Sequence, residues 1–99
     1  MIKIKYTNLD LDDLEEIWKY TLETWSEKQA DKYYFEIIDR CEELKFDFEL
    51  TNDYSSILLE LKGVKINRHL IFFRFSSNDV IEIVRILHEK MNFNRHLNI

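Results

Sequence analysis

A run of four large apolar residues, Leu70-Ile71-Phe72-Phe73, places the strongest constraint on how this chain can fold. Successive side chains of a β-strand point to opposite faces of a sheet, so this run puts apolar groups on both faces. A strand that is apolar on both faces belongs inside a sheet, with a covering layer on each side. We therefore expect residues 69–75 to form a central strand, covered by helices on one face and by another element on the other.

The sequence on either side of this run predicts two neighbouring strands. Residues 61–66 are extended in pattern and are followed by Asn67-Arg68, which we interpret as a tight turn because asparagine tolerates the left-handed backbone conformation that hairpins often need. After the turn residues 76–79, the β-branched run from Val80 to Leu87 is typical of another strand. These patterns predict a three-stranded meander.

The first half of the chain is predicted to be mainly helical. Residues 1–6 alternate apolar side chains with lysines and indicate a strand, after which Thr7 and Asp10 resemble a helix cap. A second cap at Ser26-Glu27-Lys28-Gln29 follows so closely that the two helices must form an antiparallel hairpin. Apolar residues recur at helical spacing on one face of each helix. They are Leu11, Leu14, Ile17, Trp18, Thr21, Leu22 and Trp25 in the first helix, and Ala30, Tyr33, Tyr34, Ile37, Ile38, Cys41 and Leu44 in the second.

The predicted order of elements is β-α-α-β-β-β. Neither the helical nor the strand period continues through residues 45–60, so we expect an irregular segment that ends in a short turn. The fold class is α+β, with a two-helix hairpin packed on an antiparallel sheet. A chain of 99 residues supports one hydrophobic core, so residues 1–99 are expected to form a single domain.

Charge and cysteine content argue against several classes of protein. The formal net charge of -5 disfavours binding to a nucleic-acid backbone, although basic residues gather in the last third of the chain. Cys41 is the only cysteine and cannot form an internal disulfide, and His69 and His96 have no partners at metal-ligand spacing. No apolar run is long enough for a signal peptide or a membrane span. We expect a cytoplasmic protein without metal, cofactor or membrane contact.

Five segments, spread over nearly the whole chain, follow the pattern of one protein family. They are Asp13-Leu-Glu-Glu-Ile-Trp-x-Tyr20, Trp25-x-x-x-Gln-Ala30-x-x-Tyr33, Asn67-Arg-His-Leu-Ile-Phe-Phe-Arg74, Ile83-Val-Arg-Ile-Leu-His-Glu-Lys-Met91 and His96-Leu97. In this order and spacing, the segments resemble the ParE toxins of the ParE/RelE type II toxin–antitoxin superfamily.

The chain departs from the ParE pattern at several positions. Asn67, Phe73 and Asn92 stand where relatives usually carry Gly, Tyr and Asp. Just before the second strand, Leu58-Leu59-Glu60 replaces a frequent Arg-Pro-Gly, and Lys62 replaces an arginine. The function that this region has in the relatives is therefore not assigned to residues 58–60 and Lys62 of this chain.

The resemblance implies a RelE-like fold and a toxin that blocks DNA gyrase until a cognate antitoxin neutralises it. It implies action by inhibitory protein–protein contact and not by catalysis, no cofactor, no direct nucleic-acid binding, and a hetero-oligomer with the antitoxin. Two alternatives remain. One is a RelE-like ribosome-dependent messenger RNA endoribonuclease. Such an enzyme uses a cluster of basic groups, which is a poor match for an acidic chain. The other is an inactive relative that only binds its antitoxin.

The candidate target-binding residues lie in the last third of the chain. They are Arg74, Arg85, His88, Met91, Phe93, Arg95, His96 and Leu97. Arg74, Arg85 and His88 are alternatively structural partners of carboxylates, and Phe93 and Leu97 alternatively pack on the sheet. Arg85 and His88 are three residues apart, so a strand would point them to opposite faces.

For the antitoxin, we expect a groove on the apolar strand face that the helices leave uncovered. Its candidate residues are Leu70, Phe72 and Phe73, next to the outer edge of the first helix. The aromatic residues of the helices, in contrast, are expected to pack in the core. These are Trp18, Trp25, Tyr33 and Tyr34.

Overall fold

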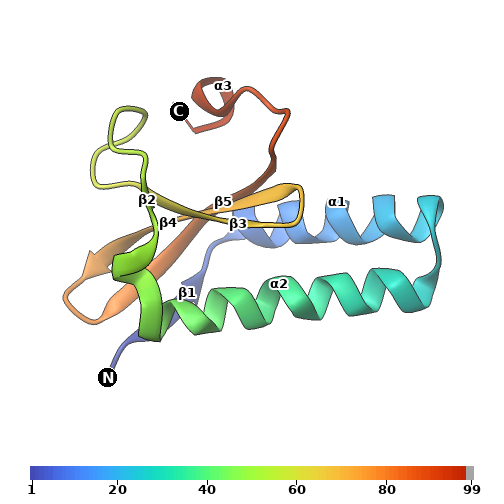
Figure 1. Cartoon of the computed structure of the whole chain (residues 1–99), viewed down its shortest axis with the longest axis horizontal. Coiled ribbons are helices and arrows are strands. Elements are labelled where there is room, and N and C mark those ends of the chain that lie inside the picture. Colours follow the sequence, from blue (N-terminus) through green and yellow to red (C-terminus); the bar gives the residue numbers. More distant parts are fainter. Residues whose placement is uncertain (98–99) are drawn as a thin grey trace.

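The computed structural model describes residues 1–97, in which helices pack on a five-stranded sheet (Figure 1). In chain order the elements are β1 (Lys3–Tyr6), α1 (Asn8–Thr24), α2 (Glu27–Asp47), the 3-10 helix η1 (Phe48–Leu50), β2 (Asn52–Asp53), β3 (Lys62–Ile66), β4 (His69–Ser77), β5 (Val80–His88) and α3 (Phe93–Leu97). The strands lie in the order β1-β5-β4-β3-β2, so β4 is central as predicted. The expected α+β fold is confirmed. No helix within residues 1–97 has the length and apolar character needed to cross a membrane.

The predicted meander is present as β3, β4 and β5, each antiparallel to the next. Asn67 forms the β3–β4 turn with a φ of 50°, the left-handed conformation expected of it. A register shift between Phe72 and Phe73 places an irregularity in the β4–β5 pairing, where Phe72 lies opposite Arg85 and Phe73 opposite Ile83. Beyond this shift, the second half of β5 continues to His88.

β1 makes the sheet mixed. It pairs in parallel with β5, from Lys3 opposite Val80 to Tyr6 opposite Ile83. The expectation of a wholly antiparallel sheet is therefore wrong. β1 is separated from β5 by the helix hairpin and the three strands β2, β3 and β4, and a connection of this length allows parallel pairing. Because β1 ends at Tyr6, the second half of β5 has no strand on this side.

Both predicted helix caps are present. The Thr7 backbone N–H donates to Asp10 Oδ2 at 2.6 Å, and the Thr7 hydroxyl accepts the Asp10 backbone N–H at 3.3 Å. Ser26 Oγ accepts the Gln29 backbone N–H at 3.1 Å and begins α2. These bonds satisfy N–H groups that have no partner inside the helix, and they place the boundary between the two helices at the predicted residues.

The segment predicted to be irregular is partly regular. α2 continues to Asp47, and η1 and β2 follow within residues 48–53. Phe46 interrupts the apolar period of α2 because it points to solvent, with 89% of its surface exposed. The last turns of α2 are held by polar contacts, since Arg40 pairs with Asp47 at 3.1 Å and Lys45 with Glu42 at 2.8 Å.

The two faces of β4 belong to two apolar cores. Ile71 and Phe73 are fully buried in the first core, between the sheet and the α1–α2 hairpin. Leu70 and Phe72 point to the opposite face and belong to the second core. This second core consists of Leu61, Leu70, Phe72, Leu87 and Leu97, with Tyr54, Ile57, Leu58, Val84 and Phe93 packed against it. The predicted two-sided covering of the strand is confirmed.

The strand face that we expected to be uncovered is closed. α3 lies on the side of the sheet away from α1 and α2 (Figure 1), and the rings of Phe93 and Phe72 have centres 5.0 Å apart. Leu70 is 7% exposed, and Phe72 and Phe73 are fully buried. An open groove over these three residues is therefore a wrong expectation. α3 and residues 54–61 cover Leu70 and Phe72, and the α1–α2 hairpin covers Phe73.

Gly63 in β3 has no side chain, which leaves room for the aromatic ring of Tyr54 against the second core. A Cβ atom at position 63 would lie 2.7 Å from Tyr54 Cε2. Tyr54 cannot easily move, because its ring meets Phe72 edge-on at 5.1 Å between centres. The Gly63→Ala variant is therefore expected to lose about 1–2 kcal/mol of unfolding free energy in urea titrations. In a Tyr54→Ala background the same change should cost nothing, and an undiminished cost there would contradict this explanation.

Candidate functional site

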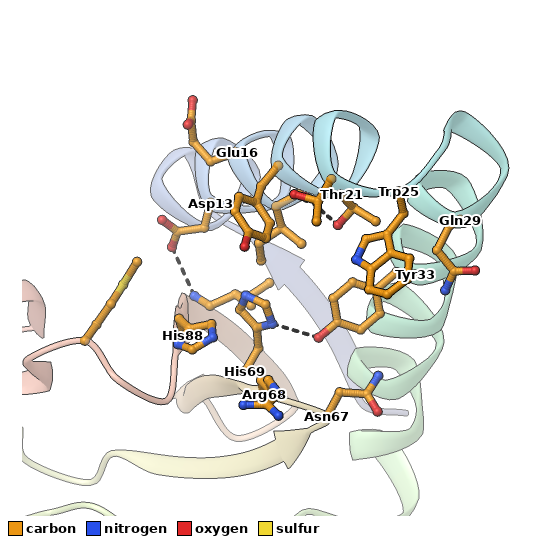
Figure 2. A pocket seen from close by; sticks show the side chains of 15 residues that line it. Asp13, Glu16, Thr21, Trp25, Gln29, Tyr33, Asn67, Arg68, His69 and His88 are labelled. Carbon is orange, nitrogen blue, oxygen red and sulfur yellow. Dashed lines mark hydrogen bonds between the residues drawn. The ribbon is translucent and has the colours of Figure 1, made fainter.

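A groove of about 1070 Å³ opens between α1 and the β3–β4 turn (Figure 2). One wall is α1 together with the start of α2, and the other is formed by the turn, the end of β5 and Met91. The groove lies where β5 extends past the last residue that β1 pairs with, and α1 packs beside this part of β5. The volume is at the upper end of the range for pockets that bind small ligands.

Exposed aromatic side chains lie at the mouth of the groove. Trp25 is 74% exposed and Tyr20 is 68% exposed, and both line the groove. The prediction that Trp25 packs in the core is wrong. Trp25 follows the last residue of α1 and is its C-terminal cap, so it continues the apolar spacing of the helix at a point where no other element covers it. Trp18, Tyr33 and Tyr34 are at least half-buried, closer to the prediction.

Two histidines and a tyrosine form the floor of the groove. His69 and His88 lie opposite each other on β4 and β5, with ring centres 5.2 Å apart. The Tyr33 hydroxyl lies 2.7 Å from His69 Nδ1, and His88 Nδ1 accepts the Lys90 backbone N–H at 3.1 Å. Burial lowers the pKa of His69 to about 4, the proximity of His88 adds to the shift, and Glu89 opposes it. His69 is therefore neutral at neutral pH, which suits a binding surface.

An ion pair closes the end of the groove beside β5. Arg85 Nε and Nη2 donate to the two carboxylate oxygens of Asp13, each at 2.8 Å. The backbone N–H of Ile86 donates to Asp13 Oδ2 at 3.0 Å. The carboxylate thus provides an acceptor for a β5 backbone N–H beyond the residues that β1 pairs with. The hydrogen bonds to Asp13 raise the pKa of Arg85, although burial opposes them. The Arg85 side chain is only 16% exposed and the Asp13 side chain 13%. Arg85 is therefore better described as a structural partner of a carboxylate than as a residue that contacts the target.

Charged residues of opposite sign stand on the two walls. Glu16 projects from α1 and Arg68 from the β3–β4 turn, on opposite sides of the groove in Figure 2. Both side chains belong to exposed residues. A partner that fills the groove therefore meets an apolar centre with an acidic and a basic edge.

The structure brings together only some of the predicted target-binding residues. His88 and Met91 line the groove, and Met91 is 45% exposed. On α3, Arg95 is exposed and His96 is half-buried, and the His96 backbone carbonyl accepts a hydrogen bond from Arg85. Arg74 lies apart from them and pairs with Glu82 at 3.9 Å.

Two further candidates, Phe93 and Leu97, are part of the second core. The alternative that they pack on the sheet is therefore confirmed. Tyr20 and Arg68 also line the groove and were not predicted from the sequence. For Tyr20, the nearby end of α1 at the Ser26 cap is a signal that could have indicated exposure. Among residues 1–97, no three His, Cys, Asp or Glu side chains are grouped so that they could hold a metal ion.

Comparisons with known proteins identify the family. The family described as "ParE toxin of type II toxin-antitoxin system, parDE" matches residues 4–93. "Toxin ParE1" of Mycobacterium tuberculosis is 27% identical over 84 residues, covering 85% of this chain and 86% of the relative. "Toxin ParE1" of Caulobacter vibrioides is 27% identical over 85 residues, covering 86% of each.

A solved structure shares the fold. It is described as "Chromosomal ParDE TA system from P. aeruginosa", is 19% identical, and superposes with a TM-score of 0.77 over 89% of this chain and 96% of that one. Since the family match spans nearly the whole chain, from β1 to the start of α3, it includes every element that builds the groove. The chain belongs to the ParE toxin family of type II toxin–antitoxin systems.

Proposed function

We propose that this toxin acts by binding DNA gyrase in the cytoplasm, and that a cognate antitoxin neutralises it by occupying the groove. The observation that carries the proposal is the exposure of Trp25 and Tyr20 at the groove mouth. Trp, Tyr and Arg are the residue types that contribute most to protein interfaces, and Arg68 supplies the third of them here. Membership of the toxin family supports an antitoxin as the partner.

The groove takes the place of the strand face as the antitoxin site. Leu70 and Phe72 lie in the second core, so an antitoxin could reach them only after α3 had moved. Phe73 is buried beneath the α1–α2 hairpin. The groove is open without any such movement. A segment seated in it would contact the apolar side chains between Glu16 and Arg68, and the complex would be a hetero-oligomer.

The proposed target surface overlaps the groove. It consists of His88, Met91 and Arg95, at the end of β5 and on the segment that leads into α3. Because His88 and Met91 also line the groove, an antitoxin seated there covers part of the target surface. Neutralisation then follows from direct competition for the same residues.

The pairing of Arg74 and Arg85 with carboxylates supports action by binding and not by catalysis. A ribonuclease needs cationic groups free to stabilise the phosphate charge that develops in the reaction. Arg85 is held by both carboxylate oxygens of Asp13, and Arg74 lies beside Glu82. In this proposal the protein acts without a cofactor and without direct contact with nucleic acid.

A supercoiling assay with purified gyrase and relaxed plasmid tests the function. We expect the toxin to abolish supercoiling and prior addition of the antitoxin to restore it. Met91→Ala and Arg95→Ala should each require about fivefold more toxin for the same inhibition, the loss expected for a contributing interface residue. Lys32→Ala is the control, because Lys32 is an exposed cation on α2 outside the groove.

Two results would contradict the proposal. Unaffected supercoiling together with cleavage of ribosome-bound messenger RNA would favour the endoribonuclease alternative. Antitoxin binding without either activity would identify an inactive relative.

A further inference from the structure

Arg85 connects two parts of the molecule on opposite sides of the sheet. Two of its nitrogens bind Asp13 on the groove wall, as described above. The third, Nη1, donates to the backbone carbonyl of His96 in α3 at 3.2 Å. One guanidinium group therefore holds α1 and α3 at the same time, and it is well suited to this because its donors form a rigid planar fork.

α3 depends on contacts of this kind for its position. It has five residues, too few for a helix that is stable by itself. The carbonyl groups of its last turn have no partners inside the helix, and the His96 carbonyl finds one in Arg85. A cation at this end also complements the negative end of the helix dipole. The remaining anchors are apolar, namely Phe93 and Leu97 in the second core.

We propose that Arg85 couples the groove to α3, so that breaking the Arg85–Asp13 pair releases α3 and exposes Leu70 and Phe72 beneath it. A partner that brings a guanidinium or ammonium group into the groove and takes Asp13 from Arg85 has the same effect as breaking the pair. By thermodynamic reciprocity, release of α3 weakens the Arg85–Asp13 pair. The inference uses one part of the proposed function, namely that the groove receives a partner.

Amide hydrogen exchange of the purified full chain tests the coupling. Arg85→Lys keeps the positive charge, but a single ammonium group cannot hold both Asp13 carboxylate oxygens and the His96 carbonyl. We expect the amides of residues 93–97 to exchange about tenfold faster, as for the loss of one charge-assisted hydrogen bond. Asp13→Asn should have the same effect from the groove side. The buried α2 residues Ile37 and Cys41 report global unfolding.

Arg40→Lys is the matched control. Arg40 also pairs with an aspartate, Asp47, at 3.1 Å, and its own side chain is 20% exposed, but its ion pairs within residues 1–97 join it only to residues of α2 itself. This variant should leave exchange of residues 93–97 unchanged. Conversely, Leu97→Ala, which loosens α3, should speed exchange of the Arg85 Nε–H measured by NMR.

Three outcomes would overturn the coupling. Exchange of residues 93–97 could stay at the wild-type rate in Arg85→Lys and Asp13→Asn. It could rise only in step with the amides of Ile37 and Cys41, or it could rise equally in Arg40→Lys. All of these measurements use the toxin alone, so they are independent of the supercoiling and antitoxin experiments that test the proposed function.

Discussion

Trp25→Ala is expected to weaken binding of the cognate antitoxin by about 30-fold or more, the effect of losing a central interface residue. The indole is 74% exposed in the free toxin and lines the groove, so it gains most of its burial only when a partner is seated. For the same reason its removal should change the unfolding free energy of the toxin by less than about 0.5 kcal/mol. Calorimetric titration and urea denaturation separate the two effects.

Phe46→Ala is the control for this substitution. Phe46 is an aromatic residue with 89% of its surface exposed, but it lies near the end of α2 and outside the groove. It should leave antitoxin affinity unchanged. Equal losses in the two variants would show that general surface hydrophobicity, and not the groove, determines binding. An unchanged affinity in Trp25→Ala would exclude the groove as the antitoxin site.

Local patterns were sufficient to predict the helix hairpin and the meander. The Thr7 and Ser26 caps, the helical spacing between them and the Asn67 turn each act within a few residues, and the structure confirms all of them. The central position of β4 was predicted from the apolar run 70–73, because a strand with apolar groups on both faces needs a covering layer on each face. Such features are visible in sequence because their causes are close together in the chain.

The groove could not be predicted in this way, because distant residues form it. Asp13 and Arg85 are 72 residues apart, and no period or turn relates them. Periodicity also placed Trp25 in the core, since spacing indicates which face of a helix is apolar but not where the covering element ends. The strand face was expected to be open because the sequence did not decide whether Phe93 and Leu97 contact a partner or pack on the sheet. The structure shows that they pack on it.

A buried carboxylate near the start of α1 is another feature that only the structure reveals. Asp10 is fully buried, and its Oδ1 atom has no hydrogen-bond partner among the described residues. Burial raises the pKa of Asp10 to about 6 from its ordinary 3.8, hydrogen bonds from Thr7 oppose the shift, and the charges of Asp13 and Glu82 add to it. The folded protein therefore holds a proton on Asp10 over a pH range in which the unfolded chain has lost it.

Asp10→Asn should therefore change how stability depends on pH. Asp10 contributes its full stabilisation below the unfolded pKa of 3.8 and loses it as pH rises through the folded value of about 6. The variant lacks this titration, so its stability relative to the natural protein should increase by about 2 kcal/mol between about pH 4.5 and about pH 7.5. Other groups, including His69, titrate in both proteins and cancel in the difference. The measurement is a pair of urea titrations at each pH, and stability curves that run parallel would show that Asp10 is already ionised at the lower pH, with its carboxylate reached by solvent.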